Sequence, residues 1–404
     1  MKKNNINIKF EAKDLFNYFL IFFSTLVLFR IILPYGDEPD YVHKYGLYLF
    51  NFGGFNIFDT SDWSQALTCN KGYLVGDLLD TFMRIAPYFC NNKAEDFAER
   101  ILIGFIINIL YFSFVFLMLK NPKILKILKI KSQTNNTNMH LFFCCLLYPS
   151  INYHLGLRSN EVFLFYIILL FFFTWQNYFV SISLSLIAAL IDPGNALVFI
   201  IFILYFYMTR FLISKFKLKY ILLSNLSLIV LIFFNHENLR EFVAILLENS
   251  GILYFQNIST HVIKDEQLYL TSSFLKLIIT YFSFIFLTPG FVKSTILFIF
   301  ISIIFVYSFL FILGIANKKK LLRLERDKNY NDTLINALIC ILYIVIMVFS
   351  LPSHSFIRYY IFVYPFIFSL LLYIFNLRII FLISIYSIFF ISFETIIFRI
   401  IYFL

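Results

Sequence analysis

Charged residues are scarce in this chain. Asp, Glu, Lys and Arg make up only 14% of its 404 residues, whereas about a quarter of an ordinary soluble domain is charged. A composition this poor in charge excludes a normal water-facing surface. Glycine and proline are also few, at 12 and 9, and no stretch rich in either divides the sequence. We therefore expect a single domain over residues 1–404.

Several motifs are missing as well. The sequence has no Gly-rich nucleotide loop and no Walker motif, which argues against an ATP-driven pump and against a cytoplasmic nucleotide-sugar transferase. No Cys and His spacing suggests zinc, so we predict no metal and no nucleotide cofactor. Among the five cysteines, only Cys69 and Cys90 share a polar stretch. They can pair if that stretch faces an oxidising compartment, and otherwise they are free thiols.

Long apolar runs fill most of the chain. Apolar residues make up 61% of the sequence, and Phe alone occurs 56 times. At about 20 residues per crossing, this pattern predicts an all-α, polytopic transmembrane helix bundle with about ten to twelve membrane segments. We expect these segments near residues 15–34, 100–118, 140–157, 161–177, 178–192, 195–210, 220–235, 272–289, 293–315, 333–351, 359–377 and 379–401.

Basic blocks between the apolar runs give the orientation. The net charge of +10 comes from lysines and arginines grouped near residues 2–13, 120–131, 210–219 and 318–328, which the positive-inside rule places in the cytoplasm. A basic face for anionic lipid headgroups is the alternative, and nothing in the pattern requires nucleic acid. The first run lacks a small-residue cleavage site, which favours an uncleaved anchor over a signal peptide. We therefore expect a cytoplasmic N-terminus.

Counting crossings from there places two long segments on the outer side. Residues 35–99 form the large first outer loop, which is periplasmic in a bacterium, and residues 235–271 form the second. Three runs between Lys219 and Lys318 would leave the two basic blocks on opposite sides. We resolve this by making residues 271–291 a re-entrant segment, since it contains Lys276 and a Thr-Pro-Gly breaker. The alternative is that one basic block is misassigned.

The unusual polar residues gather in the predicted outer segments. Polar groups at the edge of a membrane domain lie over water or in a cavity, and there they become candidates for function. We predict that acid and base chemistry comes from Asp37, Glu38, Asp40 and Asp192. We predict that substrate is bound by Arg158, Arg358, His354, His236, Arg240 and Tyr41. The plainer interpretation is that loop residues are polar because they contact water, and that arginines at helix ends extend toward the membrane surface.

These residue types suit one kind of reaction. A carboxylate can act as a general base on a sugar hydroxyl, and a pair of arginines such as Arg158 and Arg358 can hold a pyrophosphate leaving group. The combination is typical of glycosyl transfer from a polyprenyl-pyrophosphate donor. It would also suit binding without catalysis.

Three local patterns carry a resemblance to a known family. Arg30 is followed by an outer pattern of glycine, acidic residues and spaced tyrosines over residues 35–45, Arg158 opens a helix in a short loop, and Arg358 precedes two tyrosines with Pro365 beyond. In these features the chain resembles the bacterial Wzy-type O-antigen and capsule polymerases, especially the branch related to EpsG. It departs from the family at residues 192–195, where the family tends to show a histidine in a small-residue turn.

The resemblance implies an enzyme of the bacterial inner membrane that joins polyprenyl-pyrophosphate-linked oligosaccharides on the periplasmic side. It implies no nucleotide cofactor. Its partners would be the lipid bilayer, the lipid-linked oligosaccharide and other polysaccharide assembly proteins. Three alternatives stay open: a lipid-linked-sugar flippase, a multi-span glycosyltransferase that uses a lipid-phosphate sugar, and a non-catalytic assembly or export partner.

Overall fold

The computed structural model describes residues 10–32, 95–128, 132–156, 160–191, 193–216, 218–235, 328–350 and 357–374, with short stretches at 238, 241–242, 245, 377–382, 384–385 and 388. The part of the chain that it describes is helical and contains no strand. The elements are α1 (Ala12–Ile32), α5 (Glu95–Lys120), α6 (Pro122–Ile127), α7 (Ser132–Leu146), α8 (Pro149–Leu155), α9 (Asn160–Leu169), α10 (Phe171–Thr174), α11 (Tyr178–Ile191), α12 (Pro193–Lys215), α13 (Leu218–Phe234), α18 (Lys328–Ser350), η4 (Ile357–Val363) and α19 (Tyr364–Ile374). The prediction of an all-α chain is confirmed over these residues.

Two of the predicted helices are interrupted. The run at 140–157 divides into α7 and α8, and the break falls at Tyr148 because Pro149 has no backbone N–H to continue the helix and instead occupies the first turn of α8. The run at 161–177 divides into α9 and α10 at Leu170. The predicted helix at 359–377 begins as the 3-10 helix η4, in which Tyr360 has non-helical backbone angles (φ −121°, ψ 17°).

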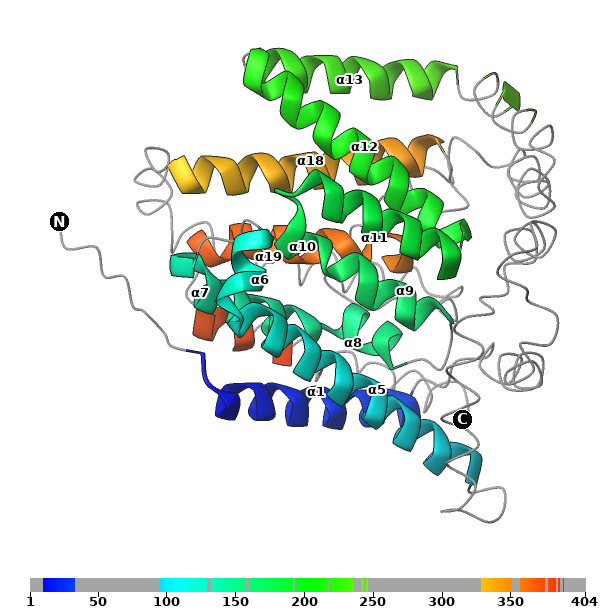
Figure 1. Ribbon diagram of the computed structural model, residues 1–404. Coiled ribbons are helices and arrows are strands. Elements are labelled where there is room, and N and C mark those ends of the chain that lie inside the picture. Colours follow the sequence, from blue (N-terminus) through cyan, green and yellow to red (C-terminus); the bar gives the residue numbers. More distant parts are fainter. Residues whose placement is uncertain are drawn as a thin grey trace, which may run out of the picture.

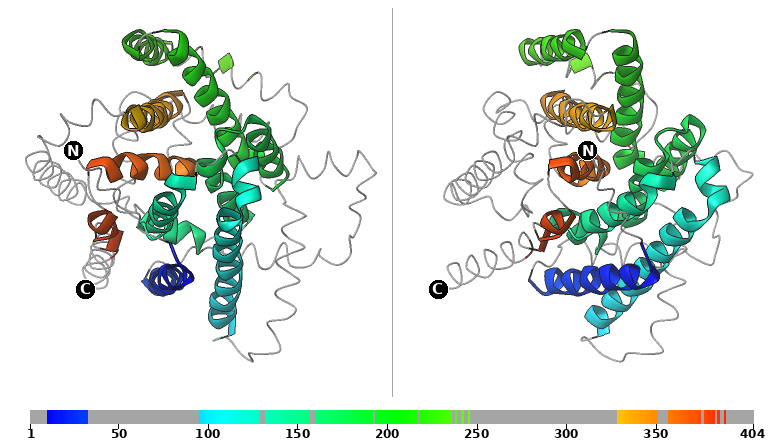
Figure 2. Two further views of the ribbon diagram at one scale, coloured as in Figure 1. Left: turned by 60° about the vertical axis from the view of Figure 1, so that its left-hand side comes forward. Right: turned by 90° about the vertical axis from the view of Figure 1, so that its left-hand side faces the viewer.

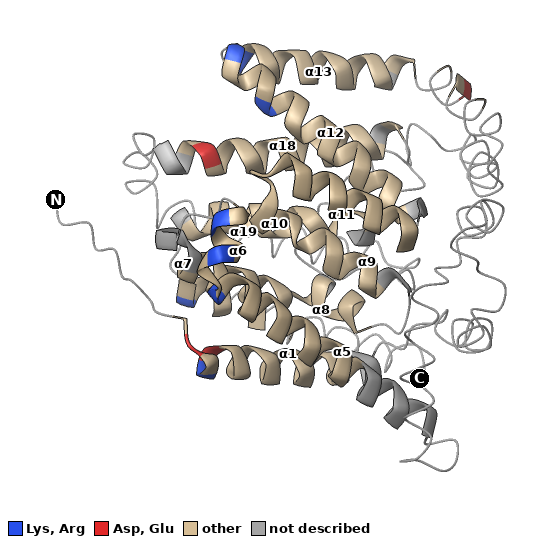
Figure 3. Cartoon of the chain, in the orientation of Figure 1, with Lys and Arg blue, Asp and Glu red and all other residues tan. Residues whose placement is uncertain are grey.

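The helices lie side by side and alternate in direction (Figures 1 and 2). At one end of the bundle α5 and α12 end, and α1, α13 and α18 begin. We refer to this as the basic end, since the described lysines gather there (Figure 3), namely Lys13, Lys120, Lys123, Lys126, Lys215 and Lys219. The opposite end is where five helices stop, at Ile32, Leu155, Ile191, Phe234 and Ser350.

Two described helices are long and apolar enough to cross a membrane. They are Asn195–Lys215 within α12 and Asn331–Val348 within α18. Shorter apolar helices accompany them at Gly104–Lys120, Val162–Thr174, Tyr178–Ile191, Lys219–Ile232 and Tyr359–Leu372. By length and composition the two long helices are a weak indication of a membrane protein, and the larger number of spans stays a prediction.

Aromatic side chains dominate the interior. Phe171 contacts the rings of Phe199, Phe202, Phe206 and Phe366, which come from α12 and α19. Edge-to-face and tilted ring pairs of this kind are favourable beyond the apolar area they bury. They join α10, α12 and α19 in the centre of the bundle.

The outer surface of the bundle is also apolar. On α11 the side chain of Phe179 is 78% exposed, and on α13 that of Phe234 is 76% exposed. The polar residues Asn108 and Asn152 are buried instead. In water such a surface would promote association, whereas lipid chains cover it without cost. The distribution of polar and apolar residues therefore favours a lipid environment.

Candidate functional site

The predicted site residues fall almost entirely outside the described part of the chain. This holds for Asp37, Glu38, Asp40, Tyr41, Arg158, Asp192, His236, Arg240 and His354. Arg358 lies in η4, where the structure describes its backbone but not its side chain. The Cys69 and Cys90 pair and residues 271–291 also lie outside the described residues.

The structure does describe the helix ends that border the predicted segments. Helices α1, α8, α11, α13 and α18 all stop at the opposite end of the bundle, away from the lysines (Figure 1). The chain after each of them contains one of the predicted polar segments. These described helix ends lie at one end of the bundle, whereas the outer location of the segments and the side-chain contacts within the site stay predictions.

Asn152 of α8 makes a buried polar contact with α1. Its side chain is fully buried, and its amide nitrogen donates to the backbone oxygen of Phe22 at 3.0 Å and to Oγ1 of Thr25 at 2.7 Å. Thr25 in turn donates to the oxygen of Phe22 at 2.8 Å. The amide oxygen of Asn152 has no hydrogen-bond partner among the described residues. Asn152 thus binds α8 to α1 through one half of its amide.

Gly156, at the end of α8, allows the same two helices to approach closely. A Cβ atom at this position would lie 2.7 Å from Cγ of Leu26 and within 3.3 Å of both its methyl groups. Leu26 is only 2% exposed, so its side chain has little room to move aside. A side chain at this position would therefore force Leu26 or one of the two helices to shift.

Aromatic contacts join α8 and its first residues to α19 and α9. Tyr148 packs against Tyr364 with ring centroids 5.5 Å apart, and His154 packs edge-on against Phe165 at 6.0 Å. The 3-10 helix η4, which contains Arg358, packs against α8, α9 and α12. A 3-10 stretch inside a bundle is often found at a functional hinge. The interrupted helix α8 and the 3-10 helix η4 therefore pack against each other.

A second buried polar contact joins α5 to α9. The hydroxyl of Tyr166 donates to the amide oxygen of Asn108, whose nitrogen donates to the oxygen of Gly104 at 2.6 Å. The ring of Tyr111 stacks on Tyr166 with centroids 4.0 Å apart. Because the amide of Asn108 is bonded at both atoms, we interpret this contact as a structural one.

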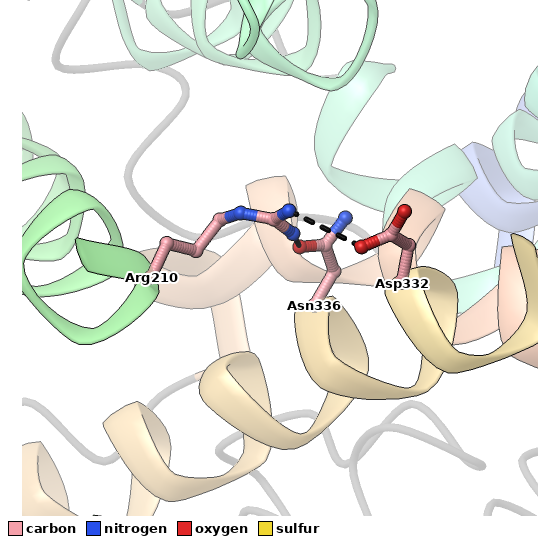
Figure 4. Close-up of polar contacts among 3 residues, drawn as sticks. All are labelled: Arg210, Asp332 and Asn336. Atoms are coloured by element: carbon pink, nitrogen blue, oxygen red, sulfur yellow. Dashed lines mark hydrogen bonds and ion pairs between the residues drawn. The ribbon is translucent and has the colours of Figure 1, made fainter. Parts of the chain in front are cut away.

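A third group of polar residues lies toward the basic end (Figure 4). Arg210 of α12 donates to the amide oxygen of Asn336 and lies 3.4 Å from a carboxylate oxygen of Asp332, both on α18. Its guanidinium also lies 4.5 Å from the ring centroid of Trp175. These contacts connect α12 to α18 through Arg210, so we interpret this arginine as a structural residue.

The polar side chains described near the opposite end do not complete the predicted chemistry. They supply an amide, hydroxyls and an imidazole, from Asn152, Thr25, Tyr148 and His154. No set of three His, Cys, Asp or Glu side chains within the described ranges could hold a metal ion. A general base of the carboxylate type would come from the segments that the helix ends border.

The contacts of Asn152, Gly156 and Arg210 were not predicted from the sequence. A signal was present for α8, because Pro149 interrupts an apolar run and two polar residues, Asn152 and His154, follow within it. The residues of α1 that contact α8 could not be recognised in the same way. Thr25 and Leu26 lie in an ordinary apolar run far away in the sequence.

Comparison with known proteins adds no further constraint: no protein-family model, no curated protein and no solved structure matches the chain.

Proposed function

We propose that the chain is a multi-pass membrane glycosyltransferase, a polymerase that joins polyprenyl-pyrophosphate-linked oligosaccharide units during synthesis of O-antigen, capsule or exopolysaccharide. The observation that carries the proposal is the placement of helix ends. Five helices stop together at the end of the bundle away from the lysines, and the chain after them carries the predicted carboxylates and arginines. The resemblance of the residues around Arg30, Arg158 and Arg358 to the Wzy-type polymerases supports it further.

The reaction follows from the chemistry of these residue types. Arg158 and Arg358 hold the pyrophosphate of the donor, and their planar guanidinium groups each bind two oxygens. A carboxylate among Asp37, Glu38 and Asp40 accepts the proton of the acceptor hydroxyl. That hydroxyl attacks the anomeric carbon of the donor sugar. The bond from this carbon to the pyrophosphate oxygen breaks, and polyprenyl pyrophosphate leaves with the negative charge that the arginines stabilise.

The proposed location is the inner membrane of a bacterium, with the N-terminus in the cytoplasm and the site on the periplasmic side. This location explains two features of the bundle. Lysines gather at one end, as expected for the cytoplasmic side, and apolar side chains such as Phe179 and Phe234 cover the outer surface.

Substitution of the two arginines tests the proposal. We expect Arg158→Lys and Arg358→Lys to lower polymer formation by a factor of about 10²–10³, because lysine keeps the charge but loses the planar fork of donors. The measurement is surface polymer on a gel, from cells that lack the natural copy, with membrane abundance quantified. Arg378→Lys is the matched control, since Arg378 is an exposed arginine after α19 and is not among the proposed site residues.

An arginine that only extends toward the membrane surface gives a different result. Lysine would then replace Arg158 or Arg358 without effect, and any loss of polymer would follow the amount of protein. Normal polymer from both variants would therefore remove the two arginines from the proposed site.

A lipid-linked-sugar flippase is the second candidate. Transporters use interrupted helices and buried polar groups. The bundle has an interrupted helix at α8 and buried asparagines at Asn108 and Asn152. Cells without the chain distinguish the two functions. Loss of a polymerase leaves single oligosaccharide units at the cell surface, whereas loss of a flippase leaves the lipid-linked units in the cytoplasmic leaflet. Purified protein supplied with a lipid-phosphate sugar or a lipid-pyrophosphate oligosaccharide separates the two transferase types.

A further inference from the structure

The contact between α1 and α8 combines two features that arise independently. One is the hydrogen bonding of Asn152 to Phe22 and Thr25, and the other is the close approach of Gly156 to Leu26. Asn152 and Gly156 are one helical turn apart, so they lie on the same face of α8. The two features therefore fix both the rotation and the distance of α8 relative to α1.

This contact lies in the parts of α1 and α8 that precede two of the proposed site segments in the sequence. The chain leaves α1 at Ile32 shortly before the acidic cluster that begins at Asp37. It leaves α8 at Leu155, and Arg158 is the second residue after Gly156. The packing of α1 on α8 thus sets the relative position of two helix ends from which proposed catalytic and binding residues follow.

We propose that Thr25, Asn152 and Gly156 are positioning residues for the glycosyl transfer. They contact no reacting group themselves and act by holding the ends of α1 and α8 in one arrangement. This inference rests on the proposed function, because it assigns these residues to the same site. A misplacement of about 1 Å far from the reacting atoms can lower a rate by a factor of about 10².

Cysteine pairing tests the contact itself. A Cβ atom at Gly156 would lie 2.7 Å from Cγ of Leu26, and one carbon–carbon bond is about 1.5 Å long, so the two Cβ atoms are at most about 4.2 Å apart. This is within the range of about 3.5–4.5 Å that a disulfide needs. We expect the double variant Leu26→Cys with Gly156→Cys to form a disulfide in isolated membranes, in a background with Cys69→Ser and Cys90→Ser.

The matched control is Leu26→Cys with Gly104→Cys. A Cβ atom at Gly104 of α5 meets no heavy atom within 4 Å, so this pair should stay reduced under the same oxidant. Linked peptides are identified by mass spectrometry after proteolysis. Free thiols in the first pair, or equal pairing in both, would overturn the inferred contact.

Activity is tested by introducing and then relieving the steric conflict. Gly156→Ala places a methyl group against Leu26, and we expect on the order of a tenfold loss of polymer per membrane protein. Adding Leu26→Ala removes the atoms that the methyl group meets, so the double variant should regain polymer relative to Gly156→Ala. Gly104→Ala is the control and should resemble the parent.

The hydrogen bonds are tested by a second pair of variants, one that keeps the hydroxyl of Thr25 and one that keeps its shape. Thr25→Ser keeps the hydroxyl that accepts from Asn152, and it should retain polymer formation. Thr25→Val keeps the shape of the side chain but leaves the amide of Asn152 with one acceptor fewer, and it should lower polymer formation at unchanged abundance. A purely structural role would instead lower abundance and activity together.

The outcomes separate the two proposals. Normal polymer in cells that lack the chain would overturn the proposed function and the inference with it. Polymer that depends on the chain, but is unchanged by both Gly156→Ala and Thr25→Val, would overturn the inference alone. Failure of Leu26→Ala to restore any polymer to Gly156→Ala, together with failure of Thr25→Ser to match the parent, would also overturn it.

Discussion

Arg210 shows how one charged side chain is accommodated between two helices. Its side chain is 24% exposed, and it is bonded to Asn336, which is buried, and to Asp332, whose side chain is 51% exposed. An ion pair with a half-exposed carboxylate contributes only about 0–1 kcal/mol, since water screens it. A buried hydrogen bond to a charged group contributes more, at about 1.5–3 kcal/mol.

These magnitudes predict an order of effects for two substitutions. Asp332→Asn should change the unfolding temperature of the purified protein in detergent very little. Asn336→Leu should lower it clearly, since the guanidinium of Arg210 loses its buried acceptor. The two residues lie on the same helix, so each serves as the control for the other. Equal losses from both would show that the ion pair contributes as much as the buried amide, contrary to this order.

Single hydroxyl groups connect helices elsewhere in the bundle. Tyr166 of α9 donates to the side chain of Asn108 on α5, and Tyr343 of α18 donates to the backbone oxygen of Val198 on α12. Both tyrosines are buried. The two acceptors differ, because a helix carbonyl such as that of Val198 also accepts the regular helical hydrogen bond, whereas the amide oxygen of Asn108 depends on Tyr166.

This difference predicts unequal costs for the same change. Tyr343→Phe should cost about 1 kcal/mol of unfolding free energy, the usual value for one lost hydrogen bond. Tyr166→Phe leaves a buried amide oxygen without a partner and should cost more, up to about 3 kcal/mol. Denaturant unfolding of the purified protein measures both. A larger cost for Tyr343→Phe would contradict the assignment of Asn108 as the dependent acceptor.

Helix positions could be predicted because apolar runs of membrane length define them. The predicted helix at 15–34 is α1 at Ala12–Ile32, and the predicted helix at 220–235 is α13 at Leu218–Phe234. The break before α8 was not predicted, although Pro149 in the apolar run indicates it. The 3-10 geometry of η4 has no comparable signal in the sequence. This segment packs against α8, α9 and α12, and these contacts between distant residues are not visible in a local pattern.

The candidate site was less accessible to prediction than the helices. Sequence reasoning selected residues by their rarity in an apolar chain, which led to Arg158, Arg358 and the acidic cluster. It could not select Gly156, since the need for glycine there arises from Leu26 on another helix. Contacts between residues far apart in the sequence depend on the packed structure, and no local pattern specifies them.

At the scale of the whole molecule, charge and apolar surface are arranged along one axis. The described lysines lie at the basic end, and exposed apolar side chains cover the flanks of α11 and α13. Helices α13 and α18 both begin at the basic end, at Leu218 and Lys328. The same placement is required by the prediction that the basic blocks near residues 210–219 and 318–328 lie on one side of a membrane.

Reporter fusions test this topology. Fusions at Ser132 and Asn329 should report the cytoplasm, because both positions follow basic blocks and lie at or next to helix starts at the basic end. Fusions at Thr68 and Gln256 should report the outer side. The re-entrant assignment at residues 271–291 predicts an even number of full crossings between Lys219 and Lys328, which is consistent with α13 and α18 beginning at the same end. An outer signal at Asn329 would place the start of α18 across the membrane from Lys219, and the re-entrant assignment would then be wrong.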